Sequence, residues 1–204
     1  MAIKASEVID KAQKLMQDDG VRYPDVDTML PWLTDGLREA VNLKPTLGVT
    51  TIEEDLVAGA RQTIGGVSVV KFVEHTPVTL AFLNQAVPSW QNHTAAAAVK
   101  FVAYDPNEPK VFYVYPPQPV DTSATISISE VIDPTALTAI IDNLPFDDIY
   151  GPALVDYLCY RCYLGEMDAG SLARADQYFA AFAGKIGGFR KPAASSRQGS
   201  GEPQ

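Results

Sequence analysis

The chain is poor in the residues from which disulfide scaffolds and zinc sites are built. Its 204 residues include only two cysteines and two histidines. Two cysteines are too few for a disulfide scaffold, and a structural zinc site needs about four such ligands. The sequence therefore predicts reduced, metal-free thiols at Cys159 and Cys162, in a chain made in a reducing cytoplasm.

Long apolar runs and an excess of positive charge are also missing. No apolar run approaches the roughly 20 residues that span a bilayer, and the N-terminal stretch MAIKASEVIDKAQK lacks the apolar centre of a secretory signal. The formal net charge is -9, and an acidic surface repels phosphate. We expect no membrane partner and no sequence-specific nucleic-acid binding, although DNA can pass such a surface without being gripped.

Hydrophobic residues make up 47% of the chain, which is enough for a packed core. Their spacing predicts helices over 6–19, 28–43, 147–165 and 171–187. Segments rich in β-branched and aromatic residues predict an antiparallel sheet within 50–132. The expected fold class is therefore α+β: the N- and C-terminal helix pairs form a four-helix bundle with an inserted antiparallel β domain, and an extended C-terminal tail follows.

The predicted domain boundaries follow this pattern. Residues 1–48 form the N-terminal helical pair, and residues 49–135 form the antiparallel β domain. Residues 136–188 form the C-terminal helical pair, which packs on the first pair. Residues 189–204 are small, polar and rich in proline and glycine, which is typical of an extended tail.

The two C-terminal helices carry the apolar faces expected to form the core. These faces are Ile149, Ala153, Tyr157, Tyr160 and Leu164 in the first helix, and Leu172, Ala175, Phe179, Phe182 and Ile186 in the second. We expect Phe179 and Phe182 to be buried against Leu33 or Leu37 of the N-terminal pair.

Candidate chemistry is sparse. The cysteines lie three residues apart within a predicted helix, whereas a redox pair normally opens a helix after a strand, so inert thiols are expected. Glu53, Glu54 and Asp55 have the composition of a divalent-metal site, but solvated charge is the simpler interpretation. Residues 59–66, GARQTIGG, lack the Gly-Lys-Ser/Thr end of a phosphate loop. We expect no catalytic, cofactor or metal residues and no enzyme activity.

The stretch VFYVYPPQP at 111–119 has two interpretations. A strand that its prolines end at the sheet edge is favoured, because a Pro-x-x-P ligand usually lies in an exposed linker and these prolines directly follow a strand. A small interaction module presenting that ligand remains an alternative. A further alternative is an enzyme with an acidic metal site that uses Glu53, Glu54 or Asp55.

Several segments, taken in order, resemble a known family. They are DVDTMLPWLTDGLREAVNLKP (25–45), DLVAGARQTI (55–64), VPSW (87–90), VFYVYPPQP, LPFDDIYGPALVDYLCYRCYLGEMD (144–168) and ARADQYFAAFAGKIG (173–187). The ordered set resembles the adaptor, or head-to-tail connector, proteins of short-tailed bacteriophages, over roughly residues 6–188. The sequence departs from the family at 65–70 and at the two cysteines.

The resemblance implies a non-catalytic structural protein of the virion neck or tail, made in the host cytoplasm. Members of this family form a dodecameric ring of identical copies beneath the portal protein and hold the tail nozzle protein, with tail fibres as a further partner. The ring forms part of the DNA ejection channel, and DNA crosses its lumen without sequence-specific binding.

The tail carries the candidate partner-binding residues. Arg190, Lys191 and Arg197 outnumber the single acid Glu202, in a chain that is acidic as a whole. This local positive charge should dock on an acidic surface of a neighbour, with Phe189 as the apolar anchor. The resemblance identifies that neighbour as the portal ring or the next adaptor subunit.

Overall fold

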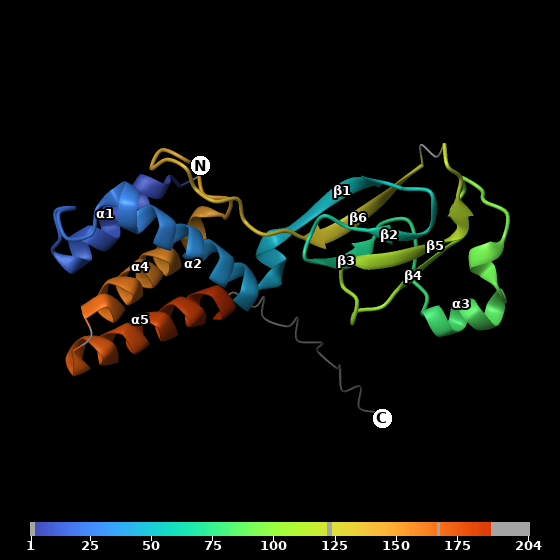
Figure 1. Cartoon of the computed structure of the whole chain (residues 1–204). Helices are drawn as coiled ribbons and strands as arrows, with labels where there is room; N and C mark the ends of the chain where they lie inside the picture. Colours follow the sequence, from blue (N-terminus) through green and yellow to red (C-terminus); the bar gives the residue numbers. More distant parts are fainter. Residues whose placement is uncertain (1–2, 122–123, 167, 189–204) are drawn as a thin grey trace, which may run out of the picture. The chain divides into compact units, whose positions relative to one another are not determined.

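The computed structural model describes residues 3–121, 124–166 and 168–188. The chain divides into two compact units. The first consists of residues up to Lys44 together with those from Ala136 onward, and the second is Pro45–Thr135. Helices dominate the first unit and strands the second (Figure 1). This mixture of helix and sheet agrees with the predicted α+β class.

The described residues of the helical unit form four α-helices. They are α1 (Ala5–Met16), α2 (Leu30–Leu43), α4 (Gly151–Glu166) and α5 (Ala169–Gly188). A π-helical turn, Asp25–Met29, leads into α2, and a 3-10 turn, Asp148–Tyr150, leads into α4. Pro31 lies in the first turn of α2, where its missing N–H costs least. All four helices were expected from the sequence, although α1 ends earlier than the periodicity indicated.

Helix α4 is the centre of the helical unit, because it contacts α1, α2 and α5. Its buried residues therefore lie on most sides of the helix. They are Gly151, Ala153, Leu154, Val155, Asp156, Tyr157, Leu158, Cys159 and Cys162. The expectation of one apolar stripe was wrong here, since Ile149 and Leu164 are exposed. A helix packed from several sides does not need a single apolar face.

Helix α5 has the expected amphipathic face only in part. Its buried apolar residues are Ala175, Phe182 and Ile186. The Phe182 ring centroid lies 5.1 Å from that of Tyr157. Leu172 is exposed, and Phe179 is half-buried against Tyr160, at 5.1 Å between ring centroids. The expected burial of Phe179 and Leu172 was therefore wrong. The face of α5 that is buried includes only some of the apolar residues that recur at helical spacing.

A glycine sets the approach of α2 to α4. A Cβ atom placed on Gly36 would lie 2.7 Å from Cδ1 of Tyr157. That separation is far inside van der Waals contact, so any larger residue has to displace the Tyr157 ring or separate the helices. The Trp-Leu-Thr-Asp-Gly segment thus contributes its glycine directly to the packing.

In the part of the β unit that the structure describes there are two sheets instead of the single sheet expected. Its strands are β1 (Val49–Asp55), β2 (Gly59–Thr63), β3 (Ser68–Phe72), β4 (Phe101–Tyr104), β5 (Val111–Gln118) and β6 (Thr125–Val131). One sheet has the order β1-β6-β3 and the other β2-β5-β4, and every pairing is antiparallel. Strand patterns identify strands but not their partners, and for this reason the division was missed.

The two sheets share one hydrophobic core. It comprises Leu56, Ile64, Phe72, Val102, Phe112, Val114, Ile126 and Ile128. A second cluster, on Ala103 of β4, contains Leu83 and the buried Trp90. Leu83 belongs to α3 (Leu80–Ala86), a short helix that the sequence analysis missed. Seven residues are too few for a clear helical period.

Strand β5 continues through its prolines instead of ending at them, so the favoured interpretation of 111–119 was wrong. The β4 ladder ends at the pair Phe101–Tyr115. The β2 ladder shifts register between Gly59 and Arg61. Pro116 and Pro117 therefore lie where neither neighbour needs their missing N–H groups. Pro116 and Pro117 are buried and Pro119 is half-buried, so the Pro-x-x-P segment is not displayed as an exposed ligand.

Candidate functional site

The predicted partner-binding residues lie outside the described part of the chain. Phe189, Arg190, Lys191 and Arg197 all follow Gly188, the last residue of α5. Their place in the sequence puts them directly after a helix of the helical unit. Their role stays a prediction.

The two cysteines are buried free thiols in α4. Burial raises the pKa of both thiols to about 12. The thiolate is the form that attacks electrophiles and binds metals. At neutral pH these side chains are therefore protonated and act as small apolar groups in the core.

The acidic segment of β1 alternates across its sheet. Glu53 accepts a hydrogen bond from the Ser127 hydroxyl on β6. Glu54 lies on the other face and is half-buried, and burial, with a smaller effect from Glu130 and then Asp55, raises the pKa of its carboxyl. Strand geometry thus points neighbouring carboxylates in opposite directions. Within the described ranges, no three His, Cys, Asp or Glu side chains are grouped so that they could hold a metal ion.

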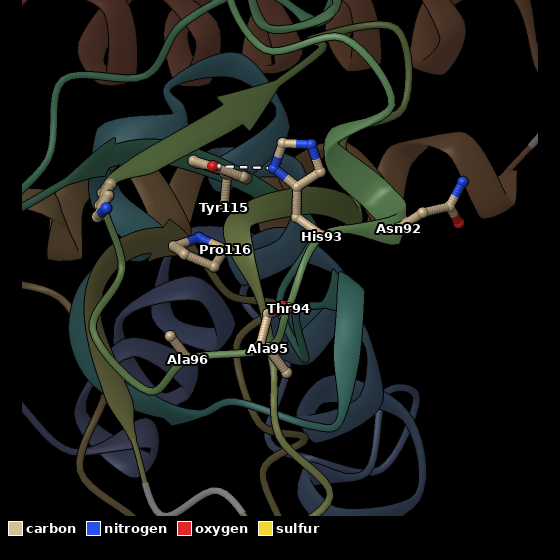
Figure 2. A pocket seen from close by; sticks show the side chains of 8 residues that line it. Asn92, His93, Thr94, Ala95, Ala96, Tyr115 and Pro116 are labelled. Atoms are coloured by element: carbon tan, nitrogen blue, oxygen red, sulfur yellow. Dashed lines mark hydrogen bonds between the residues drawn. The ribbon is translucent and has the colours of Figure 1, made fainter.

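An open pocket of about 490 Å³ lies beside the prolines of β5. Its lining includes His93, Lys100, Tyr115 and Pro116 (Figure 2). His93 Nδ1 lies 3.1 Å from the Tyr115 hydroxyl, and the two rings meet edge to face. The pocket is lined in part by polar side chains. No sequence motif pointed to it, because its residues come from a loop and from a strand about 20 residues later.

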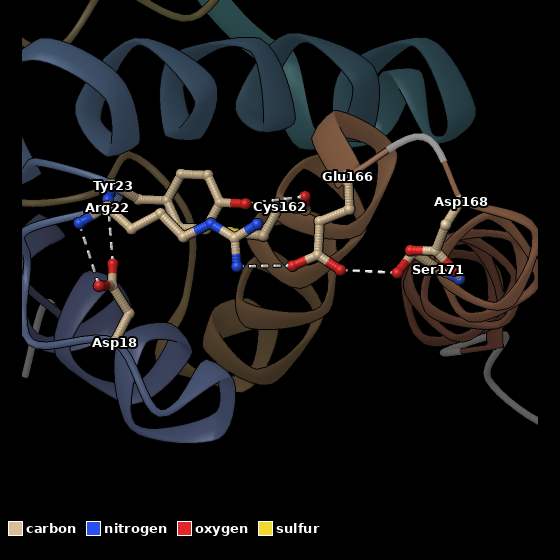
Figure 3. A network of polar contacts seen from close by, with 7 residues as sticks. All are labelled: Asp18, Arg22, Tyr23, Cys162, Glu166, Asp168 and Ser171. Carbon is tan, nitrogen blue, oxygen red and sulfur yellow. Dashed lines mark hydrogen bonds and ion pairs between the residues drawn. The ribbon is translucent and has the colours of Figure 1, made fainter.

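A polar network joins the loop after α1 to the ends of α4 and α5 (Figure 3). Asp18 accepts hydrogen bonds from the backbone N–H groups of Arg22 and Tyr23, at 3.2 and 3.1 Å. Arg22 Nη1 lies 2.9 Å from Glu166 Oε1, and the Ser171 hydroxyl donates to Glu166 Oε2 at 2.6 Å. The network fixes the loop to the turn between the two helices.

The same region holds two further anchors. The Tyr23 hydroxyl donates to the Cys162 carbonyl at 3.1 Å, and burial raises the pKa of Tyr23. Asp168 caps α5 by accepting from the Ser171 and Gly170 N–H groups, and its hydrogen bonds with Ser171 lower the pKa of its carboxyl. An aspartate directly before the first residue of a helix is an N-cap signal, and Asp168 could have been identified by it from the sequence.

A shallow groove of about 370 Å³ lies between α4 and α5. It is lined in part by the stacked rings of Tyr163 and Tyr178, with centroids 5.6 Å apart. The Arg174 guanidinium lies over the Tyr163 ring, 5.6 Å from its centroid. Asp156 at the groove pairs with Lys185. These contacts stabilise the packing of α4 on α5, and they contain no nucleophile activated by a base.

The helices of the described ranges include none that is both long and apolar enough to cross a membrane.

Comparison with known protein families gives a match over nearly the whole chain. The model of the SU10 adaptor protein family matches residues 3–204 of this chain. No curated protein matches it. The family match covers both the helical unit and the β unit.

Proposed function

Because the chain belongs to the SU10 adaptor protein family, a family of bacteriophage structural proteins, we propose that it is the head-to-tail adaptor of a phage virion. In this role it joins the portal protein to the tail nozzle protein, with tail fibres as a further partner. An adaptor acts together with other head and tail components and is located in the virion. The portal and the nozzle are the specific partners of this proposal.

One observation carries the proposal. The family match runs from residue 3 to the end of the chain, so it includes both units and the junctions between them. We infer that the helical unit is a four-helix bundle domain with the β unit as its insertion, and that both domains belong to one adaptor. The predicted domains 1–48, 49–135 and 136–188, with the tail 189–204, keep their boundaries in this proposal.

The ring and the channel follow from the same role. We infer a dodecameric ring of identical copies whose lumen forms part of the DNA ejection channel. The chain has a formal net charge of -9. An acidic surface does not hold the phosphate backbone, so DNA can slide past it during ejection. The role needs no catalysis, and a structural adaptor family favours a protein that is not an enzyme.

Inactivating the gene in a phage that encodes this chain tests the proposal. We expect DNA-filled heads that carry a portal but lack tails, because the junction for the nozzle is missing. Electron microscopy of particles from such an infection measures this, and plasmid-borne full-length protein should restore tails. Tailed, infectious particles formed without the chain would contradict the proposal.

Deleting residues 189–204 tests the role of the tail within that experiment. We expect the truncated protein to fold normally but to be missing from portal-containing particles, because Phe189, Arg190, Lys191 and Arg197 no longer dock on the neighbour. Circular dichroism checks the fold, and gel analysis of purified particles checks incorporation. A control variant replaces only Arg197, which of these four residues is the furthest from α5 in the sequence. Its incorporation into particles should be reduced less than that of the truncated protein. Unchanged incorporation of the truncated chain would show that the tail is dispensable.

A further inference from the structure

We propose that β1 and β3, the edge strands of the sheet β1-β6-β3, pair with each other between neighbouring copies of this chain. The sheet would then continue from one copy to the next. This inference rests on the proposed ring, and it names the surface through which the copies meet. Addition of a strand to an exposed sheet edge is a common mode of protein recognition.

The topology gives the two edges the required directions. Strand β6 lies in the middle of the sheet, and both β1 and β3 run antiparallel to it. The two edge strands are therefore parallel to each other. Rotation about a ring axis preserves the component of each strand along that axis, so where the strands run near the axis direction, β3 of one copy can lie beside β1 of the next in a parallel ladder. A contact between two different surfaces is the kind that closes rings.

Strand β1 offers a regular edge. Its pairing with β6 runs without a shift over all seven residues, and the strand contains no proline. Leu56 N donates to the Ala124 carbonyl and Ile132 N to the Gly48 carbonyl, both at 2.9 Å. These two bonds determine which residues of β1 form hydrogen-bonded pairs with β6 and which do not. The backbone groups that turn away from β6 are then those of Val49, Thr51, Glu53 and Asp55. No other strand of the described β unit pairs with this edge.

On one face of the sheet, β3 carries a positive charge and β1 carries negative charges. Thr51 and Lys71 both pair with Ser129, from opposite sides. The Thr51 and Ser129 hydroxyls are 2.7 Å apart, so this row of residues shares one face. Side chains alternate along β1, and Glu53 and Asp55 therefore lie on that face too. In a continued sheet, the exposed Lys71 of one copy faces the exposed carboxylates of the next.

Apolar side chains flank both edges. Around β3, Val67, Val70 and Val73 are 40, 53 and 49% exposed. At the two ends of β1, Val49 and Val57 are 38 and 58% exposed. Neighbouring exposed apolar residues commonly mark protein interfaces. Strand pairing between copies would cover them.

Edge protection is the competing explanation of β3. The pairing of β3 shifts between Val69 and Lys71, and a bulge and a lysine are devices that keep sheet edges from pairing. The two explanations differ in their response to exchanged charges. If Lys71 only protects the edge, replacing it should leave the assembly of copies unchanged or favour it. If Lys71 takes part in the pairing, replacing it alone should impair assembly, and exchanging the charges on both edges should restore it.

The test counts copies of the full chain in purified phage particles. One variant carries Glu53→Lys with Asp55→Lys, and the other carries Lys71→Glu. For each variant alone, the number of copies in particles should fall roughly tenfold or more, because like charges now face each other. Both changes in one chain, or both variants expressed together, should restore incorporation, since opposite charges meet again. Arg61→Glu, the same charge change on an edge strand of the other sheet, is the matched control and should have no effect.

Each outcome is decisive. Loss with the single-edge variants and recovery with the exchanged charges supports the pairing of β1 with β3. Normal copy numbers for all variants would overturn it while the proposed function stands, because the chain would still be in the particle. Loss without recovery would also overturn it, provided that circular dichroism shows folded variants. Absence of the unchanged chain from particles would overturn both the pairing and the proposed function.

Discussion

Replacing Phe182 with alanine is expected to lower the free energy of unfolding of the helical unit by about 3–5 kcal/mol. The side chain is fully buried and its ring packs on those of Tyr157 and Phe179. Removing it leaves a cavity where α5 packs on α4, and helices that are held from several sides cannot collapse to fill it. Urea unfolding followed by circular dichroism at the helical band measures the change.

Phe179→Ala is the matched control. The residue lies in the same helix and contacts aromatic rings, but it is half-buried. Its loss should cost about 1–2 kcal/mol, because part of the ring already faces water. Equal losses for the two variants would contradict the burial that distinguishes them.

Replacing Gly36 with alanine should destabilise the helical unit by about 1–3 kcal/mol. The added methyl group would lie 2.7 Å from Cδ1 of Tyr157, and that ring is buried between the helices. Alanine favours a helix over glycine by about 1 kcal/mol, so a net loss reports the collision and not helix propensity. The same urea unfolding experiment measures it.

Two further variants isolate the collision. Gly184→Ala lies in α5, where an added Cβ meets nothing within 4 Å, and it should stabilise the protein slightly. In a Tyr157→Ala background, Gly36→Ala should lose most of its cost, since the ring is gone. If Gly36→Ala costs as much in that background as in the unchanged chain, the close approach is not the cause.

The helices could be predicted because most have one apolar face and clear ends. Pro31 marks the start of α2, and the apolar run of α5 stops at a glycine pair. Helix α4 is different, because contacts with α1, α2 and α5 remove the periodic signal on which the prediction depended. Ile149 and Leu164 fitted the expected stripe but are exposed. Which apolar residues face the core was thus decided by neighbours far away in the sequence.

The β unit could be predicted as strands but not as two sheets. The alternation around Ile126 and Ile128 identified β6, and both residues lie in the core. Strand β5 was cut short because prolines usually end a strand. Here the neighbouring ladders stop or shift before reaching them, a fact that depends on strand pairing and not on local sequence.

Only part of the candidate functional residues could likewise be predicted from the sequence. Inert thiols at Cys159 and Cys162 were expected from their position within a predicted helix, and the structure adds that both are buried. The pocket at His93 and Tyr115 had no signal, since a strand brings distant residues together there. The tail residues from Phe189 onward were chosen for charge and composition. They lie outside the described residues, so their selection stays a prediction.

The insertion of the β unit has a consequence for the order of folding. Roughly 90 residues separate α2 from the segment that leads to α4, and closing so long a loop is entropically unfavourable. Pairing of Val49 with Val131 joins the two ends of the β unit. Once that pair forms, only a short effective loop remains, which lowers the closure cost by about 2 kcal/mol. A β unit that folds first therefore acts as a clamp that brings the two halves of the helical unit within reach of each other.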